Sequence, residues 1–198
     1  NVLIKLVQLI MALAPYGIFF LLVGVFYHLS PSQITSLFGY FFTVILVLII
    51  QFVLIYGLLL GLLARRNPLV FLKHMLPTLG FAFSTSSSFA TLPVTLKTVT
   101  EKLKVPNEVS SFTIPLGATI NMDGTAIMQG VATVFIANIY AMHLSIGQYL
   151  MIILTVTLSS IGTAGIPGIG LVTLVIVLEQ IGIPTSGVAL IFGVDRLL

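Results

Sequence analysis

The stretch Gly117-Ala-Thr-Ile-Asn-Met-Asp-Gly-Thr125 decides the fold, because it places a carboxylate inside a long apolar segment. Over residues 109–178, Asp123 is the only charged side chain. A carboxylate at the centre of a bilayer costs about 2.5–3.5 kcal/mol on insertion scales, so something must compensate it. The flanking glycines let backbone carbonyls turn inward, and the neighbouring asparagine and threonine add side-chain oxygens. Hard cations prefer such oxygen donors, which predicts a Na⁺ site in a broken span over 109–140. The competing interpretation is a structural carboxylate paired with a Lys or Arg elsewhere.

The composition around this stretch is that of a membrane protein. Of 198 residues, 58% are apolar and 7% are charged, whereas about a quarter of the residues of a soluble domain are charged. So few charges exclude a soluble enzyme and a nucleic-acid binder. The absence of cysteine excludes disulfides and thiolate chemistry. The chain lacks an initiator methionine and ends inside an apolar segment, which indicates a piece of a longer protein.

Residues 1–64 are predicted to form two transmembrane helices. After Lys5 they contain no Asp, Glu, Lys or Arg, and one bilayer crossing takes about 20 apolar residues. Pro31 marks a turn, so the two spans are expected over roughly 2–27 and 38–64. Short loops rich in Lys and Arg stay in the cytoplasm. The basic residues that follow the second span therefore place its end on the cytoplasmic side.

The remainder, 65–198, is predicted to be a transport core that begins with a re-entrant hairpin over 70–97. The charge-free part of this segment is long enough to span, but basic residues flank both of its ends. Both ends are therefore expected in the cytoplasm. Its middle reads Ser84-Thr-Ser-Ser-Ser88, a polar run that a lipid-facing helix would not place at mid-bilayer. Non-helical backbone at that depth is tolerated only where it is packed in protein or lines a cavity.

A second re-entrant hairpin is predicted over 149–182. Two apolar arms flank Ser159-Ser-Ile-Gly-Thr-Ala-Gly-Ile-Pro-Gly-Ile-Gly170, and the preceding link 141–148 has no Lys or Arg, so it is expected outside. A last helix starts near 187 and is cut at 198. Interrupted segments in an inverted repeat point to a secondary-transporter binding site at the midplane. The predicted fold class is an all-α polytopic membrane protein with transmembrane helices and two re-entrant helical hairpins.

The two predicted hairpin tips offer different chemistry. The serine run supplies hydroxyls and, where the second arm begins, free backbone N–H groups, which favour an anion. For any single serine, ordinary helix capping is the competing interpretation. The Gly-rich tip at 162–170 allows close backbone approach, although Gly and Pro are common in membrane helices. The histidines lie at predicted span ends and are interpreted as interfacial residues: His28, His74 and His143.

Three motifs, in this order, resemble those of the dicarboxylate/amino acid:cation symporter family, the glutamate transporter family. They are the serine run with Ala90-Thr-Leu-Pro93, the stretch 117–125, and the tip Ser160-Ile-Gly-Thr-Ala-Gly-Ile-Pro-Gly168. The resemblance covers the whole chain. It implies the fifth and sixth helices of the family, the first hairpin, the seventh helix, the second hairpin and the start of the eighth helix.

The resemblance also implies two sets of site residues. The substrate would be lined by Ser87, Ser88, Thr125, Ile166 and Gly170. Coupling Na⁺ ions would be held by Asn121 and Asp123 with the carbonyl of Gly117, and by the carbonyls of Thr119, Ser160, Ile161 and Thr163. No other cofactor is implied. Phe89 departs from the pattern, because many members have a fourth serine or another polar residue there.

The activity implied by the resemblance is cation-coupled symport, with Na⁺ favoured, of an acidic amino acid or dicarboxylate such as glutamate or aspartate. H⁺-coupled C4-dicarboxylate transport and neutral amino acid transport stay open, because the family keeps its substrate-selecting residues just beyond Leu198. The resemblance further implies a multi-pass protein of the plasma membrane bilayer and a homotrimer. In it, the second hairpin would be the outer gate and the core would move as an elevator against a scaffold.

Other classes fit less well. An intramembrane aspartyl protease would use two membrane aspartates, and Asp123 and Asp195 are two. Such enzymes, however, resemble one another around Gly-x-Gly-Asp, whereas this chain reads Asn-Met-Asp-Gly. An intramembrane serine protease would need a Ser–His pair at depth. A passive channel stays open, and substrate-gated, sodium-dependent uptake would distinguish a carrier from it.

Overall fold

The computed structural model describes residues 16, 19, 20, 23 and 31–195. Apart from four isolated positions, the first predicted span, 2–27, lies outside these described residues. His28, interpreted from the sequence as an interfacial residue, also lies outside them. Within the described part, every regular element is a helix, which agrees with the predicted all-α class.

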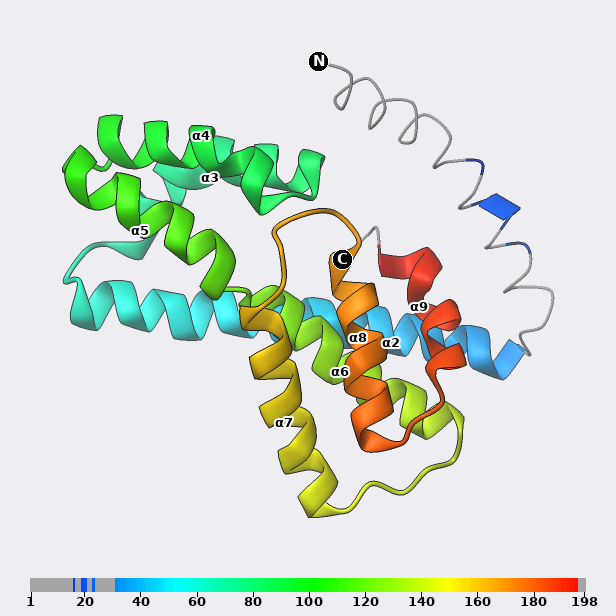
Figure 1. Cartoon of the computed structure of the whole chain (residues 1–198). Coiled ribbons are helices and arrows are strands. Elements are labelled where there is room, and N and C mark those ends of the chain that lie inside the picture. Colours follow the sequence, from blue (N-terminus) through cyan, green and yellow to red (C-terminus); the bar gives the residue numbers. More distant parts are fainter. Residues whose placement is uncertain (1–15, 17–18, 21–22, 24–30, 196–198) are drawn as a thin grey trace.

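One long helix runs along the molecule (Figure 1). It begins as α2 (Pro31–Ile50) and continues through two π-helical segments, η1 (Gln51–Tyr56) and η2 (Leu59–Leu63). Among the described residues, its section Thr35–Leu63 is the one helix long and apolar enough to cross a membrane. This section overlaps the predicted span 38–64. Only 6% of its apolar window is buried inside the chain, so most of its surface is available to lipid or to other protein segments.

The serine run joins two packed helices, α3 (Pro68–Thr85) and α4 (Ser88–Glu101). Ser86 adopts the left-handed conformation, with φ of 48°, and ends α3. Ser87 then caps α4, because its side chain accepts a hydrogen bond from the backbone N–H of Ala90 at 3.2 Å. Further along the pair, a buried hydrogen bond of 2.9 Å joins the hydroxyls of threonines 78 and 98. The two helices therefore form a tight hairpin with serines at its tip.

The stretch around Asp123 is broken, as its glycines and polar residues predict. Helix α5 (Asn107–Ile120) ends and helix α6 (Asp123–Ile139) begins on either side of two non-helical residues. Asn121 has ψ of 70° and Met122 has ψ of 45°, so neither continues the helix. The break places Asp123 in the first turn of α6. A carboxylate is favoured there, since a helix N-terminus carries partial positive charge.

A second interrupted pair follows, α7 (Ile146–Ile161) and α8 (Ile169–Ile181), which also pack together. Gly168 precedes α8 with φ of 77°, a conformation that glycine adopts without the strain of a side chain. The chain continues through the short 3₁₀ helix η3 (Thr185–Gly187) to α9 (Val188–Asp195).

The apolar core lies where α2 and helices α6 to α9 meet, and it contains Val44, Ile136, Leu174, Leu178 and Ile191 at 0% exposure. Helices α3, α4 and α5 gather near η2 at the opposite end of the long helix (Figure 1). The two groups of helices meet at the tips of the two interrupted pairs, where Ser87 and Phe89 form hydrogen bonds with Gly165.

Candidate functional site

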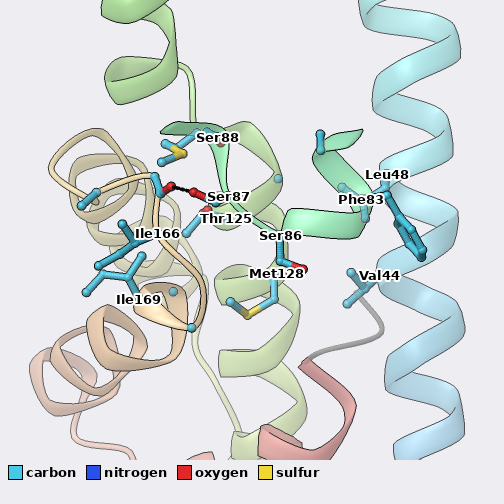
Figure 2. Close-up of a pocket in the computed structure, with 17 residues that line it drawn as sticks. Val44, Leu48, Phe83, Ser86, Ser87, Ser88, Thr125, Met128, Ile166 and Ile169 are labelled. Atoms are coloured by element: carbon cyan, nitrogen blue, oxygen red, sulfur yellow. Dashed lines mark hydrogen bonds between the residues drawn. The ribbon is translucent and has the colours of Figure 1, made fainter. Parts of the chain in front are cut away.

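A cavity of about 320 Å³ lies where the two tips meet (Figure 2). Its walls come from α2, the α3–α4 tip, the start of α6 and the 164–170 tip. Figure 2 places Ser86, Ser87 and Ser88 between Val44 and Leu48 on one side and Ile166 and Ile169 on the other. The cavity is thus built from four segments distant in sequence, with polar groups from the serine tip and apolar walls on both sides.

The two tips are joined by hydrogen bonds to one carbonyl. The hydroxyl of Ser87 donates to the Gly165 carbonyl at 2.8 Å, and the backbone N–H of Phe89 donates to the same oxygen at 3.2 Å. A Cβ at Gly165 would lie 2.9 Å from the Cβ of Ser88 and 3.2 Å from the Phe89 nitrogen. The two tips can therefore come this close only because residue 165 is a glycine.

All five sequence-derived substrate positions line this cavity: Ser87, Ser88, Thr125, Ile166 and Gly170. Phe89 does not line it. The Phe89 ring instead packs against Gly165, with Cδ1 3.1 Å from the position of an added Cβ. Phenylalanine in place of a polar residue at position 89 therefore affects the contact between the two tips. It does not remove any of the serine hydroxyls at the cavity.

Several wall residues are not indicated by the sequence patterns. They include Val44 and Leu48 of α2 and Met128 of α6. Residues 44–50 of α2 are all apolar, so the sequence carries no signal that Val44 and Leu48 would line a cavity that contains polar groups.

Three helices start at this cavity. Ser88 begins α4, Gly124 lies in the first turn of α6, and Ile169 begins α8, and all three line the cavity. Helix N-termini present unpaired backbone N–H groups and partial positive charge, which favour an anionic group. The lining residues themselves carry no charged side chain. Within the described chain, a bound carboxylate would be held by hydroxyls and helix termini.

Asp123 faces a different, neighbouring cavity of about 550 Å³. The polar side chains in its lining are those of Gln51, Tyr56 and Asp123, and the rest of the wall is apolar apart from Gly124. The hydroxyl of Tyr56 donates a hydrogen bond to Oδ2 of Asp123. Gly124 and Leu48 line both cavities, so the two spaces adjoin at the break. Sequence reasoning missed Tyr56, because nothing local links residues so far apart.

The other residues of the first predicted cation set surround the same break. The Gly117 carbonyl accepts the backbone N–H of Asn121 at 2.9 Å. The Asn121 side chain folds back over Gly117, since its Nδ2 lies 3.4 Å from the position of an added Cβ there. Asn121 and Asp123 thus lie on either side of Met122 at the junction of two helices.

The second predicted cation set is split between two helices that contact each other, α5 and α7. Thr119 is in the last turn of α5, and its hydroxyl donates to the Leu116 carbonyl at 2.8 Å. Ser160 lies in the last turn of α7 and Thr163 lies two residues beyond the end of that helix, and both are buried, with 4% and 3% exposure. Ile161, the last residue of α7, is 45% exposed. The Ser160 carbonyl accepts the Thr163 N–H at 3.1 Å.

The donor chemistry of both sets is compatible with a hard monovalent cation. The potential ligands are hydroxyl, carboxylate, carboxamide and carbonyl oxygens, which suit such ions. No group of three or more His, Cys, Asp or Glu side chains arranged for a metal occurs among the described residues.

In the described part of the chain every regular element is a helix, and interrupted helices converge on one cavity, a feature that is typical of membrane carriers. Residues 1–198 match the sodium:dicarboxylate symporter family, and the chain belongs to that family. The family resemblance drawn from the three motifs is therefore confirmed, and with it the class of membrane transporters.

Among the relatives, excitatory amino acid transporter 3 of Oryctolagus cuniculus is 46% identical over 195 residues. Excitatory amino acid transporter 1 of Homo sapiens is 45% identical over 196 residues. A putative sodium-dependent excitatory amino acid transporter of Caenorhabditis elegans is also 45% identical over 196 residues. Each alignment covers 98% of this chain but only 36–39% of the relative. The chain thus corresponds to little more than a third of each relative's length.

Proposed function

We propose that this chain is the substrate- and cation-binding part of a sodium-coupled symporter for an acidic amino acid or dicarboxylate. The observation that carries the proposal is the convergence of all five substrate positions on one cavity, beside a second cavity that holds Asp123. The names of the relatives, which include a sodium-dependent excitatory amino acid transporter, support both the ion and the substrate class.

On the substrate side, a carboxylate is held by the serine tip and the starts of α4 and α8. The Ser88 hydroxyl and the N–H groups at the two helix starts are the donors. Ser87 serves the tip contact instead, because its hydroxyl already donates to the Gly165 carbonyl. Residues of the complete protein outside this chain supply the remaining contacts that separate one acidic substrate from another.

On the cation side, Na⁺ binds at the break through the Asp123 carboxylate and neighbouring oxygens. Its charge offsets the cost of a carboxylate at membrane depth. Cation binding fixes the first turn of α6, where Gly124 and Thr125 contribute to the substrate cavity. Because each ligand favours the same ordered break, each raises the affinity of the other, and this linkage is reciprocal.

The gating assignment rests on the tip contact. Release of the Gly165 carbonyl from Ser87 and Phe89 separates the 162–170 tip from the serine tip and opens the cavity. In this proposal both helix pairs are re-entrant hairpins related by an inverted repeat, and 70–97 and 149–182 enter from opposite faces. The complete protein is a plasma-membrane homotrimer whose core, 65–198, moves as an elevator.

Counterflow in proteoliposomes tests the proposal. The complete protein is loaded with unlabelled aspartate, malate or serine, and uptake of the labelled compound is measured in sodium and in choline media at two pH values. Sodium-dependent exchange of aspartate or malate supports the proposal. The uncharged lining of the cavity makes neutral amino acid transport the second candidate, and exchange of serine alone would establish it. Exchange driven by protons in choline would replace Na⁺ by H⁺ as the coupling ion.

A further inference from the structure

The contact between Tyr56 and Asp123 joins the long apolar helix to the broken one. Tyr56 is the last residue of η1, Asp123 is the first of α6, and the phenol donates to the carboxylate. No Lys, Arg or His of the described residues forms an ion pair with Asp123, so the partner that the structure provides is neutral. A neutral donor stabilises the carboxylate without cancelling its charge, which leaves the charge available to a cation.

The backbone that carries Tyr56 is itself unusual. Residues 51–56 and 59–63 are π-helical, and such widened turns are rare and occur frequently at functional sites. Neither segment has a buried residue. Core packing within the described chain therefore does not account for the widened turns, whereas the hydrogen bond to Asp123 is a specific interaction formed at the end of the first.

The cavity next to this contact has the size and chemistry to admit a small cation. Its volume of about 550 Å³ accommodates an ion with water, and its polar side chains all carry oxygen: Gln51, Tyr56 and Asp123. The Tyr56 hydrogen bond occupies Oδ2 of Asp123. An ion that binds the carboxylate from this cavity must share the carboxylate with the phenol or displace it.

From these observations we propose that Tyr56 is a positioning residue that competes with the coupling cation for the Asp123 carboxylate. This inference rests on the proposed function, because it takes Asp123 as the cation ligand. In the cation-free state, the phenol holds and partly compensates the carboxylate. On binding, the cation takes over that compensation and the hydrogen bond weakens. Tyr56 thereby lowers the affinity for the cation and favours its release.

The test is sodium-dependent thermal stabilisation of the purified complete protein, which does not require transport. Tyr56→Phe removes the donor and keeps the ring. We expect its apparent sodium affinity to rise about tenfold, since hydrogen bonds to charged groups contribute on that scale. Tyr140→Phe is the matched control, because it removes a phenol that bonds a neutral hydroxyl, that of Ser186, at 2.8 Å. It should leave the sodium affinity unchanged.

Asp123→Asn distinguishes a wrong cation site from a wrong role for Tyr56. Loss of sodium stabilisation in Asp123→Asn, together with tighter sodium binding by Tyr56→Phe alone that disappears in the Asp123→Asn background, supports both the cation site and the role of Tyr56. If Asp123→Asn loses the sodium effect while Tyr56→Phe alone keeps the parental affinity or binds more weakly, Tyr56 is a structural contact or a ligand and the inference is overturned. If Asp123→Asn responds to sodium as the parent does, the proposed cation site itself is wrong, and the inference fails with it.

Discussion

Replacement of Gly165 by alanine is expected to weaken substrate binding by preventing the two tips from closing. An added Cβ would lie 2.9 Å from the Ser88 Cβ and 3.2 Å from the Phe89 nitrogen. Both atoms belong to or adjoin the backbone at the start of α4, so no side-chain rotation relieves the overlap. The 162–170 tip must move away instead, and that movement lengthens the two hydrogen bonds that the Gly165 carbonyl accepts.

The magnitude follows from those two bonds. Each contributes about 0.5–1.5 kcal/mol, so losing both costs the closed state about 1–3 kcal/mol. Because 1.4 kcal/mol corresponds to a tenfold change in an equilibrium constant, substrate affinity should fall by about five- to 150-fold. The cavity beside Asp123 contains no residue of the 162–170 tip, so sodium binding at Asp123 without substrate should be nearly unchanged.

The assay is equilibrium binding of labelled substrate to the purified complete protein at saturating sodium. Gly162→Ala is the matched control on the same tip, because its added Cβ would meet only the Ser159 carbonyl, at 3.9 Å. This control should bind substrate as the parent does. A Gly165→Ala protein whose substrate affinity stays within twofold of the parent would show that the tip contact does not determine closure.

Two further predictions concern the second tip and the topology. Gly168 has φ of 77°, and an added Cβ there would meet no atom within 4 Å. Gly168→Val should therefore weaken substrate affinity through backbone strain, whereas Gly168→Asn should keep most of the affinity, because asparagine tolerates that conformation. Equal substrate affinities for the two variants would argue against strain. The chain has no cysteine of its own, so single cysteines can be introduced in place of Arg66, Asn107 and His143. The first two should react with an impermeant thiol reagent from the cytoplasmic side, and the third should react from outside. Labelling of the cysteines at positions 66 and 107 from opposite sides would make 70–97 a true span.

The break and the two tips could be predicted because local chemistry determines them. A lone carboxylate flanked by glycines cannot be accommodated in a regular lipid-facing helix, and the structure interrupts the helix at Asn121 and Met122. The serine run likewise combines a left-handed residue, Ser86, with a capping residue, Ser87. In both places the residues that cause the irregularity are neighbours in the sequence.

The contributions of the long helix could not be predicted, because they depend on tertiary contacts. Residues 44–50 are all apolar, so no periodicity distinguishes Val44 and Leu48, which line the cavity between the two tips, from the positions around them. Tyr56 looks like one more aromatic residue in an apolar span. Its hydrogen bond to Asp123 depends on how the chain folds, because the two residues are 67 positions apart in the sequence.

The most direct test of the account measures substrate affinity as a function of sodium concentration in the parent and in Asp123→Asn. The central claim is that a cation at Asp123 and a substrate in the adjoining cavity stabilise one ordered break. The parent should therefore bind labelled substrate more tightly as sodium rises, and Asp123→Asn, which keeps the shape and removes the charge, should bind it weakly at every sodium concentration. A sodium dependence in Asp123→Asn that overlays that of the parent would contradict the account, and Asp123 would then be a structural carboxylate.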